Sequence, residues 1–250
     1  MRLMGLLRWN GLTLAVLLTG LLVPMVGGGI EMKDEGTKQE MDPTGINSKT
    51  IVIIGASYAG GWTSERPVAG YRIINKGVNG EQSFEMLARF ESDVAALKPD
   101  AVMIWGFIND VFRSDQSQID QTLRRARESL QAMVGRARKA GITPILATEV
   151  TIREKARWSE GIESMIGKLL GKASYQDYIN GHVSEVNRWI RELAAREGIL
   201  LLDLERVLAD PQNVRKKEYA LPDGSHISPQ GYEAIRRYSE ERLRGASAPR

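Results

Sequence analysis

The sequence predicts an α/β protein, a three-layer α/β/α sandwich around a five-stranded parallel sheet with strand order 2-1-3-4-5. The first observation is that short, continuous apolar runs alternate along the chain with longer segments of helical periodicity. The second is the composition, because 250 residues that are 42% hydrophobic and 26% charged suit one globular domain. The third is that polar residues able to do chemistry follow the apolar runs, where strands would end.

The segment 50–57, with the sequence TIVIIGAS, is the clearest strand in the chain. Its β-branched residues show no polar alternation, which is typical of a strand buried on both faces of a parallel sheet. Ser57 then stands at the carboxyl end of the strand, where ligands bind in open α/β sheets. A serine at this junction fits a catalytic nucleophile and also a helix N-cap.

Four further strands and four long helices are expected after this segment. The strands are predicted at residues 71–75, 101–105, 143–148 and 199–203. The helices, which carry apolar residues at helical spacing, are predicted over 81–97, 119–141 and 175–197 and from Ser228-Pro229 onward. The last helix begins with a serine N-cap and a proline at the first helical position. This alternation predicts helices on both faces of a doubly wound sheet.

The N-terminal residues have the pattern of an export signal. Arg2 and Arg8 precede an apolar stretch over residues 11–23, and Pro24 and the glycines at 27–29 follow it. The apolar stretch is about the minimum length for a membrane span, so an uncleaved anchor and association with a membrane through this segment stay open. We expect an exported protein, either periplasmic or anchored to the outer face of the cytoplasmic membrane.

The chain therefore divides into three predicted parts. They are a signal peptide or membrane anchor at 1–26, a flexible polar and Gly-rich linker at 27–48, and a folded domain at 49–250.

Composition excludes several classes of function. The chain has no cysteine, so thiol catalysis, disulfides and thiolate metal sites are excluded. Only His182 and His226 are available as imidazole ligands, and the sequence predicts neither a metal nor an organic cofactor. The formal net charge of +3 lacks the strong basic excess of nucleic-acid-binding proteins, so nucleic acid is not an expected partner.

A serine, a histidine and an aspartate form a candidate catalytic triad. Serine becomes a nucleophile when a base takes its proton, and imidazole is the usual base. His226 lies outside any predicted helix interior, whereas His182 lies within an amphipathic helix and is interpreted as structural. Asp223, three residues before His226, can fold back across a Gly-Ser turn and hold the imidazole.

Three groups could stabilise the oxyanion of a tetrahedral intermediate. They are the Ser57 amide, the Gly80 amide and the Asn109 side-chain amide, which follow the first, second and third predicted strands. Taken singly, Gly80 can be a helix-start glycine, Asn109 a turn residue and Asp223-Gly224 a surface turn. Their joint position at one edge of the sheet favours the catalytic interpretation.

These four sequence blocks closely resemble the SGNH (GDSL) hydrolase family, which is named for a serine, a glycine, an asparagine and a histidine. The resemblance spans Ile51 to about Tyr232, and its Gly-x-x-Asn-Asp and Asp-x-x-His blocks are its specific part. Carried over by motif, it implies Ser57 as nucleophile, Gly80 and Asn109 as oxyanion donors, His226 as base and Asp223 as the residue that orients it.

The resemblance also implies a flavodoxin-like sheet and metal-free hydrolysis of carboxylic esters, often acyl groups on lipids or sugars. The chain departs from the family at Ala56, where an aspartate is usual. Because that aspartate is not a triad member, the departure concerns loop geometry and subfamily rather than the chemistry.

Two other classes of function were weighed against an esterase. The segment 54–60 also resembles a flavin or nicotinamide dinucleotide fingerprint, but Ser57 occupies the position of a glycine that must admit the pyrophosphate. The acidic residue expected about 20 positions later is missing as well. A catalytically idle, glycan-binding module of the same fold is the other alternative, and an activity assay distinguishes it.

The sequence leaves the acyl group and the alcohol of the substrate open, so a lipid, a glycan or a small-molecule ester all fit. It also leaves open hydrolysis versus acyl transfer, and the oligomeric state. Residues 153–172 form a long connection after the fourth strand, and we expect it to be either a lid over the acyl pocket or a surface excursion.

Overall fold

The computed structural model of the chain describes residues 49–62, 66–154 and 174–247. The predicted export signal and linker, and most of the predicted lid at 153–172, lie outside the described residues. Within the described part of the chain, no helix is long and apolar enough to cross a bilayer.

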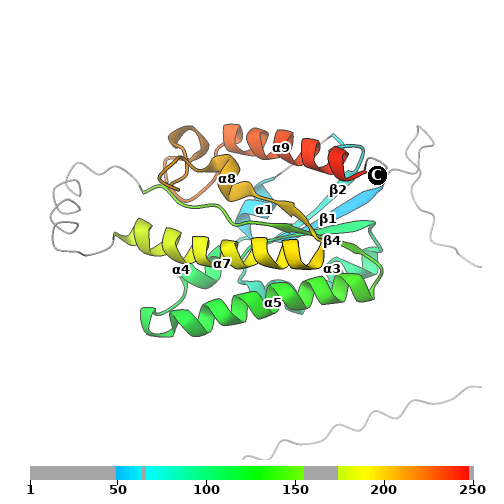
Figure 1. The fold of residues 1–250 in the computed structure, drawn as a ribbon, viewed down its shortest axis with the longest axis horizontal. Coiled ribbons are helices and arrows are strands. Elements are labelled where there is room, and N and C mark those ends of the chain that lie inside the picture. The colour runs from blue at the N-terminus through cyan, green and yellow to red at the C-terminus, as the bar shows by residue number, and fades with distance from the viewer. Residues whose placement is uncertain (1–48, 63–65, 155–173, 248–250) are drawn as a thin grey trace, which may run out of the picture. The chain divides into compact units, whose positions relative to one another are not determined.

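Five parallel strands form one sheet, and their order is β2-β1-β3-β4-β5 (Figure 1). The strands are β1 (Thr50–Gly55), β2 (Arg72–Gly77), β3 (Ala101–Trp105), β4 (Thr143–Ala147) and β5 (Leu200–Leu202). Both the parallel sheet and its order confirm the prediction, and each strand lies within two residues of its expected position.

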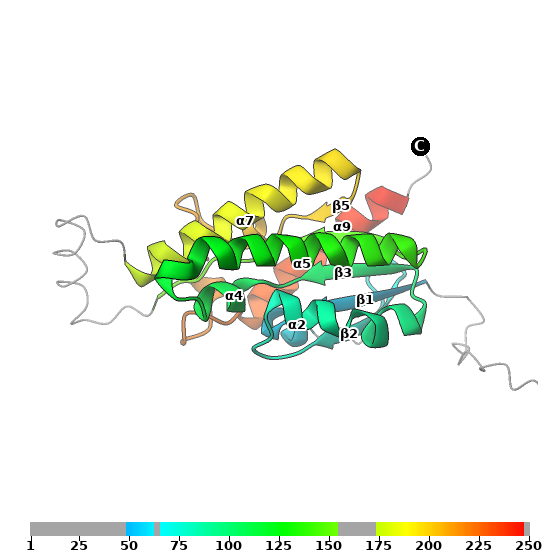
Figure 2. The ribbon, with the colours of Figure 1, turned by 90° about the horizontal axis from the view of Figure 1, so that it is seen from below.

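Helices cover both faces of the sheet. They are α1 (Ser57–Gly61), α2 (Ser83–Ala88), α3 (Phe90–Asp93), α4 (Ile108–Phe112), α5 (Ile119–Lys139), α7 (Tyr175–Glu197), α8 (Leu204–Leu208) and α9 (Pro229–Ser247), with short 3-10 turns η1 (Ala95–Leu97), η2 (Gln116–Gln118) and η3 (Lys217–Tyr219). Figure 1 shows α8 and α9 on one face and α5 and α7 on the other. Figure 2, seen from the second face, shows α7, α5 and α2 side by side across the sheet.

The long helices begin and end at residues that satisfy their terminal backbone groups. The Ser174 hydroxyl accepts a hydrogen bond from the Asp177 amide at the start of α7, and Gly198 ends that helix at φ 64°. At the start of α9, the Ser228 hydroxyl accepts from the Gly231 amide at 3.2 Å. The Ser228 cap, followed by Pro229, is the local signal from which the start of α9 was predicted.

The prediction of a single helix over 81–97 is wrong, because the segment forms α2, α3 and η1 instead. The first break falls at Arg89, whose backbone (φ −97°, ψ 8°) leaves the helical region. Its guanidinium donates to the Glu81 carboxylate, to Asp93 and to the Gly55 carbonyl at the end of β1. The contact with Gly55 lies outside the segment and favours a bent path, and periodicity alone cannot reveal it.

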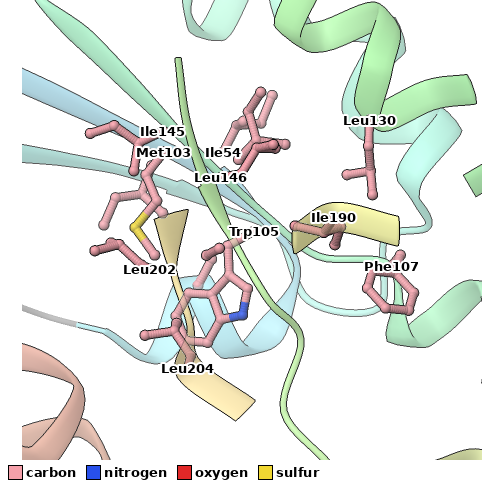
Figure 3. Packing of buried hydrophobic residues seen from close by; sticks show 14 of the residues in the cluster. Ile54, Met103, Trp105, Phe107, Leu130, Ile145, Leu146, Ile190, Leu202 and Leu204 are labelled. Carbon is pink, nitrogen blue, oxygen red and sulfur yellow. The ribbon is translucent and has the colours of Figure 1, made fainter. Parts of the chain in front are cut away.

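The core fills the space between the sheet and both helical layers. Figure 3 shows Met103, Trp105 and Leu204 together on one side of the sheet, with Leu130 and Ile190 on the other. All of these side chains are buried. Strands that bury both faces in this way carry continuous apolar sequence, which is why the apolar runs identified them.

Helix α1 packs so closely on the sheet that the contact requires glycine. A Cβ atom added to Gly77 in β2 would lie 2.1 Å from the backbone nitrogen of Gly60 in α1. We therefore expect Gly77→Ala to lower the free energy of unfolding by about 3 kcal/mol, the upper end of the usual effect of overpacking. Urea unfolding followed by circular dichroism measures this change.

Gly135, in the middle of α5, is the matched control. Nothing lies within 4 Å of a Cβ added there, so Gly135→Ala should raise stability by about 0.5–1 kcal/mol through helix propensity. Equal effects of the two substitutions would contradict close packing of α1 on β2.

Candidate active site

Neighbouring strand ends bring three of the predicted site residues to one edge of the sheet. In the register of the sheet, Gly55 at the end of β1 pairs with Gly77 in β2 and with Trp105 in β3. The three strands therefore end level with one another. Ser57, Gly80 and Asn109 follow these ends within four residues.

Ser57 is the first residue of α1 and is half-buried. The chain turns into α1 directly after β1, and the Gly60 amide donates to the Ala56 carbonyl at 2.9 Å. A Cβ atom on Gly55 would lie 2.2 Å from the Trp105 carbonyl oxygen, so only glycine fits at this turn. Ala56, where an aspartate was expected by resemblance, is a buried residue that faces Gly106 at the end of β3.

A hydrogen bond to the residue after Gly80 brings Asn109 close to the Gly80 turn. The Asn109 side-chain amide donates to the carbonyl oxygen of Glu81, the residue after Gly80, at 2.9 Å. Gly80 itself has φ 79°, a conformation that favours glycine. A side-chain amide carries two N–H bonds, so Asn109 keeps a second donor for an oxyanion.

Asp110, to which the sequence analysis gave no separate role, stabilises the positions of Gly80 and Asn109 relative to each other. Its fully buried carboxylate accepts from the Ser83 amide at 2.7 Å and from the Ser83 hydroxyl at 2.8 Å. Burial raises the pKa of Asp110, and the bonds from Ser83 oppose that rise. The pair joins the start of α2 to α4, and so holds the Gly80 turn against the helix that carries Asn109.

Asp223 and His226 form a hydrogen-bonded pair in the loop before α9. The imidazole Nδ1 lies 2.7 Å from Asp223 Oδ2, and the other carboxylate oxygen accepts from the backbone amides of His226 at 2.8 Å and Ser225 at 2.9 Å. With Nδ1 donating to the carboxylate, Nε2 is free to accept a proton. The loop therefore places the aspartate as the sequence predicted.

The Asp223 carboxyl group has a lowered pKa. Its slight burial acts to raise the pKa, but hydrogen bonds from His226 and Ser225 lower it to about 2. The carboxylate therefore stays ionised at any pH above this value, and it can stabilise a protonated His226.

The two halves of the site meet at Tyr58, the residue after Ser57. The rings of Tyr58 and His226 lie edge to face, with their centroids 6.4 Å apart. Among the described residues, no hydrogen bond joins Ser57 to the His226 ring. Bonds between nucleophile and base are often long in the absence of substrate, so this geometry is compatible with catalysis.

His182 takes no part in this site. It lies within α7, where its ring packs against Tyr178 at 4.6 Å and its Nδ1 lies 3.8 Å from Glu185. This placement agrees with the structural interpretation of His182.

Residues 54–234 match the model of the GDSL-like lipase/acylhydrolase family, which is most of the described domain. The chain belongs to this family. As a member, it is a carboxylic ester hydrolase of the acylhydrolase class.

The chain is also similar to three other proteins. An acetylxylan esterase of Geobacillus stearothermophilus is 49% identical over 47 residues, which cover 19% of this chain and 22% of that protein. The uncharacterized lipoprotein YqeF of Bacillus subtilis is 25% identical over 177 residues, with 65% of this chain and 71% of that protein covered. The crystal structure of a GDSL-like lipase of Bacteroides thetaiotaomicron superposes with a TM-score of 0.60 at 22% identity, covering 80% and 89% of the two chains, and shows the shared fold.

The sequence analysis of this acylhydrolase missed the buried polar residues beneath the site, Tyr58, Glu149 and Arg215. Tyr58 lies in a glycine-rich segment, Glu149 follows the apolar run of the fourth strand and Arg215 lies in a polar, basic stretch. A fully buried arginine is rare, but its burial depends on contacts distant in sequence, so no local signal marks it.

Proposed function

We propose that this protein is an exported serine esterase that cleaves carboxylic esters through an acyl-enzyme on Ser57. The observation that carries the proposal is the Asp223–His226 pair, bonded at 2.7 Å, beside the residue that follows Ser57. In this function Ser57, His226 and Asp223 are the triad. Gly80 and Asn109 are oxyanion donors together with the Ser57 amide.

The chemistry follows from these roles. His226 Nε2 takes the proton of the Ser57 hydroxyl as Oγ bonds to the ester carbonyl carbon, and the oxyanion accepts hydrogen bonds from the three amide donors. The tetrahedral intermediate then expels the alcohol, which receives its proton from His226. Water attacks the acyl-serine by the same route, releasing the acid and restoring Ser57. Asp223 holds the imidazole and stabilises its protonated form in both halves.

The N-terminal pattern supports a location outside the cytoplasm. A relative at low identity is called a lipoprotein, but this chain has no cysteine for lipid attachment. We therefore propose that it is periplasmic or held at the outer face of the cytoplasmic membrane by its own apolar segment. Mass spectrometry of the mature N-terminus after secretion tests cleavage of that segment.

Two observations bear on the substrate. The similarity to an acetylxylan esterase favours a short acyl group on a glycan. A cavity of about 650 Å³ between α4, the helix that carries Asn109, and the start of α7 is lined by Phe112, Tyr178 and Ile179 among others, and its apolar surface would also suit a longer acyl chain. Turnover of nitrophenyl esters of increasing acyl length, with Ser57→Ala as the control, tests the proposal. If the wild-type protein cleaves no ester, a glycan-binding role replaces the enzyme.

Asn109→Ala is expected to lower kcat by about 100- to 1000-fold, as for the loss of one oxyanion donor. The Michaelis constant should change little, because the lost bond forms mainly in the transition state. Steady-state kinetics on a nitrophenyl ester measure both constants. Gln118→Ala, a change on the exposed turn after α4, is the control and should leave kcat within about twofold.

A further inference from the structure

Arg215 is fully buried beneath the active site, in the connection between α8 and η3. Burial of a guanidinium is unfavourable unless its N–H groups find partners. Here Nε donates to the Thr151 carbonyl at 2.8 Å, Nη1 to the Ser225 carbonyl at 2.7 Å and Nη2 to the Tyr58 hydroxyl at 3.1 Å. One side chain thus joins three segments that are far apart in sequence.

Arg215 and Tyr58 both donate to a single carbonyl oxygen, that of Ser225. The Tyr58 hydroxyl donates to the Ser225 carbonyl at 2.5 Å, beside the bond from Arg215. Burial raises the pKa of Tyr58 to about 12, so the hydroxyl keeps its proton and remains a donor. Because Ser225 directly precedes His226, these bonds fix the peptide from which the imidazole projects.

The catalytic loop has little packing of its own to fix it. The side chains of His226 and Asp223 are 51% and 43% exposed. Besides the bonds to Ser225, the Gly224 carbonyl accepts from the Arg153 amide and the His226 carbonyl from the Leu221 amide, both at 2.9 Å. The position of the imidazole relative to the nucleophile therefore depends on backbone contacts, and two of these come from Arg215 and Tyr58.

Tyr58 links the hydrogen bonds at the Ser225 carbonyl to the nucleophile. It follows Ser57 in α1, and its own carbonyl accepts from the Tyr232 hydroxyl of α9 at 3.0 Å. The Arg215 guanidinium also lies over the Tyr58 ring, 5.0 Å from its centroid. Movement of the Ser225–His226 peptide relative to α1 would break at least one of these contacts.

Glu149 extends the network to the oxyanion side. Its buried carboxylate accepts from the Phe107 amide at 3.1 Å, just before α4 and Asn109. Burial raises the pKa of Glu149, and attraction to Arg215 opposes the rise.

We propose that Arg215 and Tyr58 are positioning residues for catalysis: through the Ser225 carbonyl they hold His226 in register with Ser57. This role rests on the proposed function of His226 as the base. Neither residue touches the reacting atoms, so both act on the alignment of base and nucleophile rather than on binding of the ester.

Tyr58→Phe tests the role with the smallest change, because it removes the hydroxyl and keeps the buried ring. We expect kcat for nitrophenyl acetate to fall about 10- to 100-fold, as for misplacement of a catalytic group by a fraction of an ångström to one ångström. KM should change less than threefold. Arg215→Lys keeps the charge but not the three-way geometry, and it should show the same split between kcat and KM.

Tyr238→Phe is the matched control, because its hydroxyl accepts from the Asp203 amide at 3.2 Å, away from the catalytic loop. Its urea midpoint should fall about as much as that of Tyr58→Phe, with kcat unchanged. The role is refuted if kcat of Tyr58→Phe stays within twofold of wild type, or if Tyr238→Phe loses as much kcat. In a His226→Ala background, Tyr58→Phe should have no further effect on residual turnover; a further loss there would mean a general structural effect.

A second measurement needs no substrate and so separates this inference from the proposed function. The chain has only two histidines, His182 and His226, so ring-¹⁵N-labelled, untagged protein gives two assignable sets of imidazole signals. Tyr58→Phe should shift or broaden the His226 signals and leave those of His182 unchanged. Unchanged signals from both rings would overturn the positioning role even if the enzyme is active.

Discussion

Replacing either Ser57 or His226 by alanine is expected to lower kcat for ester hydrolysis on the order of a millionfold, and replacing both should cost little more. The serine is a weak nucleophile without the base, and the base has no proton to take without the serine. The residual rate would come from the oxyanion donors and from binding. Single and double variants assayed on one nitrophenyl ester, at enzyme concentrations high enough to detect the residual rate, measure this non-additivity.

The chain offers close controls for both changes. Ser225 lies beside the triad, with its hydroxyl 3.3 Å from His226 Nδ1, and His182 is the other histidine. Ser225→Ala and His182→Ala should each retain kcat within a few-fold of wild type. If the fold loss of kcat in the double variant equals the product of the two single losses, Ser57 and His226 do not act together.

Asp223→Asn should lower kcat by about 10⁴-fold with little change in structure. The asparagine amide would donate to the ring at the place where the carboxylate accepts, so the imidazole would carry its proton on Nε2 and could not act as the base. It would also remove the charge that stabilises the protonated imidazole, a charge that persists in the native protein because the pKa of Asp223 is about 2.

Steady-state kinetics at neutral pH measure this loss, and Asp115→Asn, on the exposed turn before η2, is the control. A variant of Asp223 that keeps more than a tenth of wild-type kcat would mean that the aspartate only shapes the loop.

The parts of the fold that depend on local pattern were predictable from sequence. Strands β1, β3 and β4 are apolar runs because helices cover both of their faces, and α7 was placed at its observed bounds because apolar residues recur along it at helical spacing. The helix expected over 81–97 was wrong because the chain leaves the helical region at Arg89, whose guanidinium binds the Gly55 carbonyl outside the segment. Side-chain contacts of that kind leave no trace in hydrophobic periodicity.

The candidate site also has a part that the local sequence predicts and a part that depends on distant contacts. Asp223 and His226 are three residues apart, so their pairing could be inferred from a turn of ordinary geometry. Arg215 and Tyr58 are separated by 157 positions, and their meeting on the Ser225 carbonyl requires the whole domain to fold. The candidate catalytic residues could therefore be predicted from the sequence. The residues that position them could be identified only from the folded structure.

Covalent capture of the nucleophile tests the central claim most directly. The purified protein is incubated with a serine-directed fluorophosphonate, digested and analysed by tandem mass spectrometry, beside Ser57→Ala and Ser225→Ala treated in the same way. We predict one phosphonate adduct, on Ser57, in wild type and in Ser225→Ala, with loss of ester hydrolysis in proportion to labelling. An active wild-type enzyme that carries no adduct on Ser57, or a Ser57→Ala variant that still hydrolyses esters at a comparable rate, would contradict catalysis through Ser57.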